Sequence, residues 1–231
     1  MIQAEGRVVM VSGASRGIGR AVRERLLRAG YTVSAGVRNP AGLSEQDGLS
    51  IHAYEAASTD GARIWVEATI ARHGRIDAVV NAAGINTRGH LLDTDETAFR
   101  STWQINAMGP TRVIRAAWPH LIACGTGRVV NLSSLSGKRV RNDNLAYAMS
   151  KFALMALTQE VRRSGWAHGI RATAVCPGFV DTDMTAHVDS MARDAMSRPD
   201  DVAALIETVL ALPNNAAIAE LLVNCRHEDL L

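Results

Sequence analysis

Tyr147 and Lys151 stand four residues apart, a spacing that places both side chains on one face of a helix. A phenol with its ordinary pKa of about 10 is a poor base at neutral pH. A neighbouring ammonium favours the phenolate, so we expect Lys151 to bring the pKa of Tyr147 towards the working range of an acid and base. A Tyr-x-x-x-Lys spacing alone is frequent by chance, and its meaning depends on the elements around it.

A glycine-rich segment, Ser12 to Gly19, joins the first apolar run of the chain to the first helical pattern. Gly13, Gly17 and Gly19 would let the backbone turn sharply and approach a pyrophosphate, where free N–H groups and the helix dipole favour an anion. Such a triplet is a weak signal alone and a stronger one between a first strand and a first helix. The alternative is a tight turn that only packs the helix on the sheet.

Short apolar runs alternate with helix-length segments along the whole chain, which predicts a parallel sheet covered on both faces. We expect strands at 7–12, 31–37, 51–54, 77–80, 128–132, 171–175 and 220–224, and helices at 18–29, 62–73, 95–106, 109–123, 147–163 and 200–212. Right-handed crossovers make this a doubly wound, Rossmann-like α/β fold of about seven strands, whose ligand crevice lies at the carboxyl ends of the strands. The segment between Arg38 and Ile51 leaves little room for a crossover helix. No repeat or linker divides the 231 residues, so we expect a single domain.

The composition excludes several other classes of function. The net charge is +2 and no sustained basic face is visible, which argues against a nucleic-acid partner. No apolar run is long enough to span a bilayer and the first residues are not a signal peptide, so we expect a cytoplasmic protein without a membrane partner. The three cysteines and seven histidines show no metal-ligand spacing, and we expect no metal site.

Together these motifs resemble the short-chain dehydrogenase/reductase family in its compact, single-domain form. The glycine spacing is Gly-x-x-x-Gly-x-Gly, and the segment from Asn81 to Gly84 matches the family's Asn-Asn-Ala-Gly, with Ala82 in place of the second asparagine. The segment from Pro177 to Thr182 matches the family's Pro-Gly loop. The resemblance implies an enzyme that moves a hydride between a nicotinamide cofactor and a carbonyl or alcohol carbon of a small molecule.

The resemblance also assigns catalytic roles. Ser134 lies 13 residues before Tyr147, the spacing of the family's catalytic serine, and would donate a hydrogen bond to the substrate oxygen. Tyr147 would supply the proton in reduction and remove it in oxidation. Lys151 would stabilise the tyrosinate and hold the ribose of the nicotinamide. Asn106 matches the asparagine of the family's tetrad and would hold a water that links Lys151 to solvent.

The expected cofactor is NADP(H) rather than NAD(H). An acidic residue at the end of the second strand normally binds the ribose of NAD, whereas a cation accommodates the 2′-phosphate of NADP. Here that strand ends at Arg38, and Arg16 is a second cation that could reach the same phosphate. Glu55 stands where the family usually has the aspartate that contacts adenine. The resemblance places the cofactor against Gly13, Ser15, Arg16, Gly17, Ile18, Gly19, Arg38, Glu55, Asn81, Ala82, Gly84, Tyr147, Lys151, Pro177, Gly178, Val180 and Thr182.

The substrate itself is not fixed by these motifs. Residues 183–198 contain several methionines and are expected to form a partly apolar lid over it. Lys138, Arg139 and Arg141 follow the serine and either meet an anionic substrate or are solvated surface charges. Two other functions stay open: a family member that retains NADP and performs an epimerase or lyase step, and a non-catalytic NADP-sensing module, which the presence of both Tyr147 and Lys151 disfavours.

We expect the chain to assemble as a homodimer or homotetramer. The helices at 95–123 and 147–163 carry more apolar residues than packing on the sheet requires, among them Phe152, Leu154, Met155 and Leu157. The family commonly pairs these helices across a two-fold axis. The alternative is that the extra residues pack under loops of the same chain.

Overall fold

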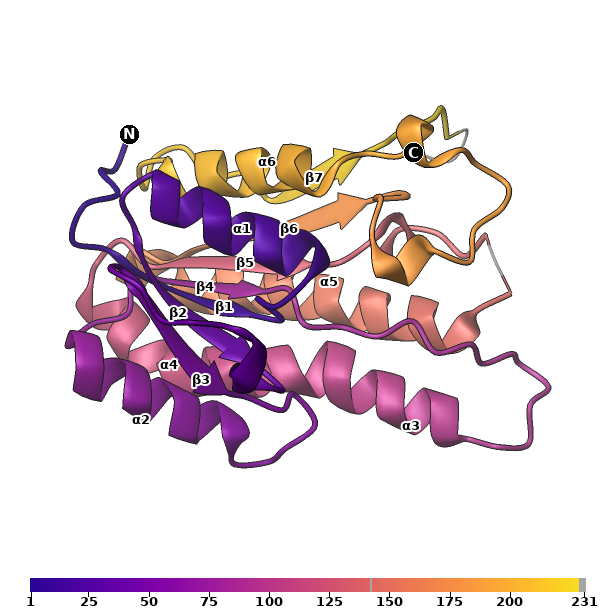
Figure 1. Cartoon of the computed structure of the whole chain (residues 1–231), viewed down its shortest axis with the longest axis horizontal. Coiled ribbons are helices and arrows are strands. Elements are labelled where there is room, and N and C mark those ends of the chain that lie inside the picture. The colour runs from indigo at the N-terminus through magenta and orange to yellow at the C-terminus, as the bar shows by residue number, and fades with distance from the viewer. Residues whose placement is uncertain (142, 229–231) are drawn as a thin grey trace.

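The computed structural model describes residues 1–141 and 143–228. Within them, one parallel sheet has seven strands in the order β3-β2-β1-β4-β5-β6-β7 (Figure 1). The strands are β1 (Val8–Ser12), β2 (Thr32–Val37), β3 (Leu49–Ala53), β4 (Ala78–Asn81), β5 (Arg128–Leu132), β6 (Arg171–Pro177) and β7 (Glu220–Val223). The strand order reverses between β1 and β4, which opens a ligand crevice at their carboxyl ends. The predicted doubly wound fold is confirmed.

Helices cover both faces of the sheet (Figure 1). On one face lie α1 (Gly17–Arg28) and α6 (Pro199–Ala211), and on the other α2 (Gly61–His73), α4 (Gly109–Ala123) and α5 (Leu145–Gly165). Helix α1 ends where predicted, because Gly30 follows it with a φ of +89°, the left-handed conformation that terminates helices. No described helix is both long and apolar enough to cross a membrane.

The strands consist of continuous apolar runs because a separate hydrophobic core covers each face of the sheet. Val9 and Val11 of β1 pack in the core under α1 and α6, whereas Met10 between them packs in the core under α2 and α4. All three side chains are fully buried. A strand covered on both sides needs an apolar residue at every position, whichever way its side chain points.

The segment expected to hold a helix at 95–106 differs from the prediction. Helix α3 spans Thr97–Trp103 and is followed by one π-helical turn, Gln104–Met108, which leads directly into α4. The pattern of apolar residues does not distinguish the wider π turn from an α turn. Such turns are frequent at functional sites, and this one contains Asn106.

The loop after β2 and the loop predicted as a lid both contain short 3₁₀ turns. The short segment after β2 holds only a 3₁₀ turn, Pro40–Gly42, as its length predicted. The predicted lid contains two 3₁₀ turns, Asp183–Thr185 and Arg193–Ala195. Of the α5 residues expected in an interface between subunits, two are buried inside this chain, Leu154 and Met155, and Met155 packs against residues of β6.

Candidate active site and cofactor groove

Two adjoining cavities lie at the carboxyl ends of the strands. The larger has a volume of about 680 Å³ and extends over the ends of β5 and β6. The smaller, of about 170 Å³, follows the glycine-rich segment after β1. They form one groove, because five residues line both: Ile18, Ala82, Gly84, Thr182 and Met184.

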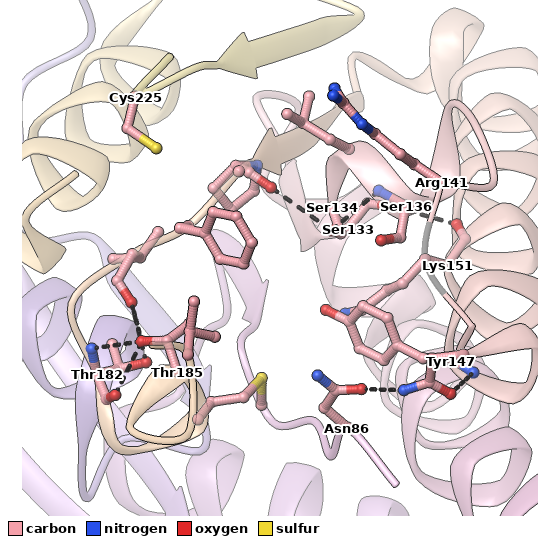
Figure 2. Close-up of a pocket in the computed structure, with 18 of the residues that line it drawn as sticks. Asn86, Ser133, Ser134, Ser136, Arg141, Tyr147, Lys151, Thr182, Thr185 and Cys225 are labelled. Atoms are coloured by element: carbon pink, nitrogen blue, oxygen red, sulfur yellow. Dashed lines mark hydrogen bonds between the residues drawn. The ribbon is translucent and has the colours of Figure 1, made fainter. Parts of the chain in front are cut away.

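The predicted serine, tyrosine and lysine come together in the larger cavity. Ser134 follows β5, and Tyr147 and Lys151 lie in the first two turns of α5. The Lys151 Nζ lies 5.4 Å from the centre of the Tyr147 ring and donates a 2.7 Å hydrogen bond to a backbone carbonyl at the end of β5. Figure 2 shows Tyr147 and Lys151 on one wall of the pocket, with Thr182 and Thr185 on the opposite wall.

Asn144, which the sequence reasoning missed, holds the start of α5 in place. Its Oδ1 accepts hydrogen bonds from the backbone N–H groups of Tyr147 and Gly89, both at 3.3 Å. Its Nδ2 donates to Asn86 in the loop after β4. Asparagine is a preferred N-cap residue whose side chain accepts a hydrogen bond from the backbone N–H of the third helical residue. Its position three residues before Tyr147 could therefore have predicted this role.

Burial dominates the pKa values of Tyr147 and Lys151, and the predicted lowering of the tyrosine pKa is wrong. Burial raises the pKa of Tyr147 to about 12, although a hydrogen bond with Ser134 acts to lower it. Burial lowers the pKa of Lys151 to about 8. The prediction weighed the lysine charge and omitted the loss of water around the phenol, which here dominates. The Tyr147 phenol therefore keeps its proton throughout the neutral range.

Asn106 lies beside this pair but its side chain is already bonded. Its Nδ2 donates to the Ile85 carbonyl at 2.8 Å and to Ser150 Oγ at 3.1 Å, and its Oδ1 accepts from the Ile85 N–H at 2.9 Å. A Cβ on Gly84 would lie 3.3 Å from the Asn106 Oδ1 and 3.8 Å from the Lys151 Nζ. The asparagine, the glycine and the lysine are thus neighbours, and the water assigned to Asn106 stays a prediction.

The glycine-rich segment forms a cradle that fits a pyrophosphate. Gly13 has a φ of +66°, and a Cβ there would lie 2.8 Å from the backbone of Ala83. A Cβ on Gly19 would lie 2.3 Å from the Gly13 carbonyl oxygen. No side chain in the described part of the chain caps the N-terminus of α1, and its first turn holds no acidic residue, so its N–H groups are left for an anion.

The charged residues predicted for the adenosine end of the cofactor line the smaller cavity: Arg16, Arg38 and Glu55. Arg16 and Arg38 are exposed, and the Arg16 Nη1 lies 3.6 Å from a carboxylate oxygen of Asp183. The Glu55 Oε1 accepts a 3.3 Å hydrogen bond from the backbone N–H two residues later. The two cations and the acid predicted to contact the 2′-phosphate and the adenine therefore line one cavity.

Asn81 lies behind the groove rather than in its lining. Its Nδ2 donates to Asn131 at 2.8 Å, and Asn131 in turn donates to Thr158 of α5 at 2.9 Å. This series of hydrogen-bonded side chains links β4 to β5 and to α5. The other residues predicted to contact the cofactor line one or both cavities: Gly13, Ser15, Arg16, Gly17, Ile18, Gly19, Arg38, Glu55, Ala82, Gly84, Tyr147, Lys151, Pro177, Gly178, Val180 and Thr182.

The three cations after Ser134 have different surroundings. Lys138 pairs with Glu220 at 2.6 Å and is not among the residues that line the cavity. Arg139 and Arg141 do line it, and both bind the carboxylate of Glu228. No sequence pattern indicated Glu228, because it reaches the cavity only through the path of the chain after β7.

Comparisons with known proteins match nearly the whole chain. The model of the short chain dehydrogenase family matches residues 7–193. An agropine synthesis reductase of Rhizobium rhizogenes is 38% identical over 229 residues, which cover 96% of this chain and 53% of that protein. The chain thus spans about half the length of this relative. A 3-oxoacyl-acyl-carrier-protein reductase of Thermotoga maritima is 32% identical, with 89% of this chain and 90% of that protein covered.

Two solved structures resemble the fold closely. A short chain dehydrogenase from Burkholderia cenocepacia in complex with NADP has a TM-score of 0.87 and 30% identity, covering 96% of this chain and 98% of that one. An alcohol dehydrogenase from the archaeon Thermococcus sibiricus, complexed with 5-hydroxy-NADP, has a TM-score of 0.84 and 25% identity, covering 94% of this chain and 95% of that one.

Proposed function

Because the chain belongs to the short-chain dehydrogenase family, we propose that it reduces a carbonyl group of a small molecule with NADPH and oxidises the corresponding alcohol in reverse. One observation carries the proposal. The cavity that holds Ser134, Tyr147 and Lys151 is continuous with the glycine cradle at α1. A cofactor bound along this groove would offer its reactive ring beside a proton donor.

The choice of NADPH over NADH rests on the adenosine end of the groove. Arg16 and Arg38 line it, and β2 ends without an acidic residue that would repel a phosphate. Guanidinium groups suit a phosphate because they donate several N–H groups in one plane. The two solved relatives described above carry NADP or its 5-hydroxy derivative, which is consistent with this choice.

The residues divide the chemistry of reduction among them. The nicotinamide supplies the hydride. Ser134 donates a hydrogen bond to the substrate oxygen, where negative charge develops. Tyr147 gives that oxygen its proton, and the pKa of about 12 keeps the phenol protonated at neutral pH. The Lys151 ammonium would bind the ribose hydroxyls of the cofactor and would stabilise the charge left on the phenol oxygen after the proton is transferred.

The proposal extends to assembly. Met149 and Phe152 on α5 are 48% and 42% exposed, and Trp103 at the end of the neighbouring α3 is 43% exposed. Large apolar side chains that remain exposed together on neighbouring helices favour an interface with a second copy of the chain. A homodimer or homotetramer would cover them.

The test is the oxidation of NADPH, followed by the loss of its absorbance in the presence of ketones, aldehydes, alcohols and hydroxy acids. We expect net oxidation with at least one carbonyl compound, and a much lower kcat/KM with NADH. Conversion of a substrate without net change in NADPH would instead indicate the epimerase or lyase alternative. Tight NADPH binding without any turnover would indicate the sensing module.

A further inference from the structure

A carboxylate of the chain itself sits in the larger cavity on two arginines. The Glu228 Oε2 accepts hydrogen bonds from Arg139 Nε at 3.2 Å and Nη2 at 2.9 Å, and from Arg141 Nη1 at 2.7 Å. The Nε of Arg226 lies 3.6 Å from the other carboxylate oxygen. The Glu228 side chain is only 4% exposed. Arg139, Arg141 and Arg226 thus form a carboxylate site, in which N–H donors already bind one carboxylate.

In the part of the chain that the structure describes, positive charges outnumber negative charges around this carboxylate site. Among the described residues, three guanidinium groups surround this carboxylate, and the cavity is lined by five arginines and lysines and three aspartates and glutamates. Burial acts to raise the pKa of Glu228, but hydrogen bonds from Arg139 and Arg141 and their charges outweigh burial and lower it. Because the Arg139 side chain is only 14% exposed, it needs an anionic partner, whether Glu228 or another.

The carboxylate site lies in the same cavity as Ser134 and Tyr147. Arg139, Arg141 and Glu228 line it together with Ser134 and Tyr147. Figure 2 shows Arg141 on the same side of the pocket as Ser134. A substrate whose carbonyl group contacts Tyr147 can therefore extend an acidic end to the arginines without leaving the cavity.

We propose that the substrate is an oxo acid whose carboxylate binds to Arg139 and Arg141, in the place that Glu228 holds in this structure. This subsite rests on the reductase function proposed above. Charge-assisted, multiple N–H donors make arginine selective for a carboxylate over a neutral ester of the same shape. Glu228 acts as an internal competitor, which keeps the buried Arg139 and the half-exposed Arg141 paired until the substrate displaces it.

The test compares acids with their methyl esters. Acetoacetate, 4-oxopentanoate and 5-oxohexanoate and their methyl esters are assayed with NADPH, and the ratio of kcat/KM for acid over ester is measured. We expect a ratio above one for at least one chain length. Arg139→Gln and Arg141→Gln lower it about tenfold or more, since one lost charge-assisted contact has that size. Glu228→Gln raises it, because the competing charge is removed.

Lys138→Gln is the matched control. Lys138 lies next to Arg139 and is also paired with an acid, Glu220, but it is not in the lining of the cavity. This variant loses one positive charge from the same segment and should leave the ratio unchanged. Arg141→Gln guards against misfolding, because its side chain is 47% exposed and tolerates replacement better than that of Arg139.

Each outcome decides the proposal. An acid-to-ester ratio near one in the unaltered protein, or one that both arginine variants leave unmoved, overturns the subsite while the reductase function stands. If no compound oxidises NADPH, the reductase function fails, and calorimetric binding of 5-oxohexanoate decides the subsite alone. Binding that is lost in Arg139→Gln then supports it, and absence of binding overturns it.

Discussion

Replacing Arg38 by serine tests the choice of cofactor at one side chain. Arg38 follows the end of β2, and its side chain belongs to the lining of the smaller cavity. A hydrogen bond to a charged group contributes about 1.5–3 kcal/mol, and the exposure of Arg38 places it at the lower end because water screens the charge. Since about 1.4 kcal/mol is tenfold in affinity, we expect the Kd of NADPH to rise about tenfold.

Two comparisons sharpen this experiment. NADH lacks the 2′-phosphate, so its Kd should change less than that of NADPH. Arg16→Ser should weaken NADPH binding less than Arg38→Ser does, because Arg16 lies 3.6 Å from Asp183 and exchanges one anion for another. Fluorescence titration of the bound nicotinamide measures all of these affinities. Equal losses for NADPH and NADH, or a preference of the unaltered protein for NADH, would refute the reasoning.

Three further outcomes follow from the structure. Asn144→Ala should lower the free energy of unfolding in urea by about 1 kcal/mol, as loss of an N-cap does, and slow turnover through misplacement of Tyr147; unchanged stability would contradict this. The pKa of Lys151, lowered to about 8, means that its ammonium is lost as the pH rises through 8, so kcat/KM for reduction should fall above that pH, and a flat profile to pH 10 would disagree. Light scattering during size exclusion should give a multiple of 24.8 kDa for the unaltered protein and a smaller mass for Met149→Glu combined with Phe152→Glu, whereas a monomer at micromolar concentration would exclude the interface.

The features that depend on local spacing were predictable from the sequence. The Tyr147 and Lys151 pair, the glycine cradle and the alternation of apolar runs with helices each follow from periodicities that neighbouring residues impose. Ser134 was found through its distance from Tyr147 in the family. Parallel strands bring these segments to one edge of the sheet. The correct prediction of the fold class therefore also predicted that these segments lie close together.

The features that depend on tertiary surroundings were not predictable. The pKa of Tyr147 rises because the folded chain removes water from the phenol, and no spacing reports that burial. Glu228 contacts Arg139 only because the chain after β7 returns to the loop that follows β5. The sequence did not distinguish Lys138 from Arg139 and Arg141, yet Lys138 pairs with Glu220, which is not among the residues that line the cavity. Residues adjacent in sequence thus point to different partners.

The most direct test of the account is the turnover of Tyr147→Phe with NADPH and a reducible ketone. The substitution removes the hydroxyl that we propose as the proton donor and leaves the glycine cradle and the two arginines of the groove intact. We expect NADPH to bind with nearly its original Kd while kcat falls about a hundredfold to ten-thousandfold, the range of a lost general acid. A kcat that stays near that of the unaltered protein across the pH range would contradict the central claim that Tyr147 is the proton donor.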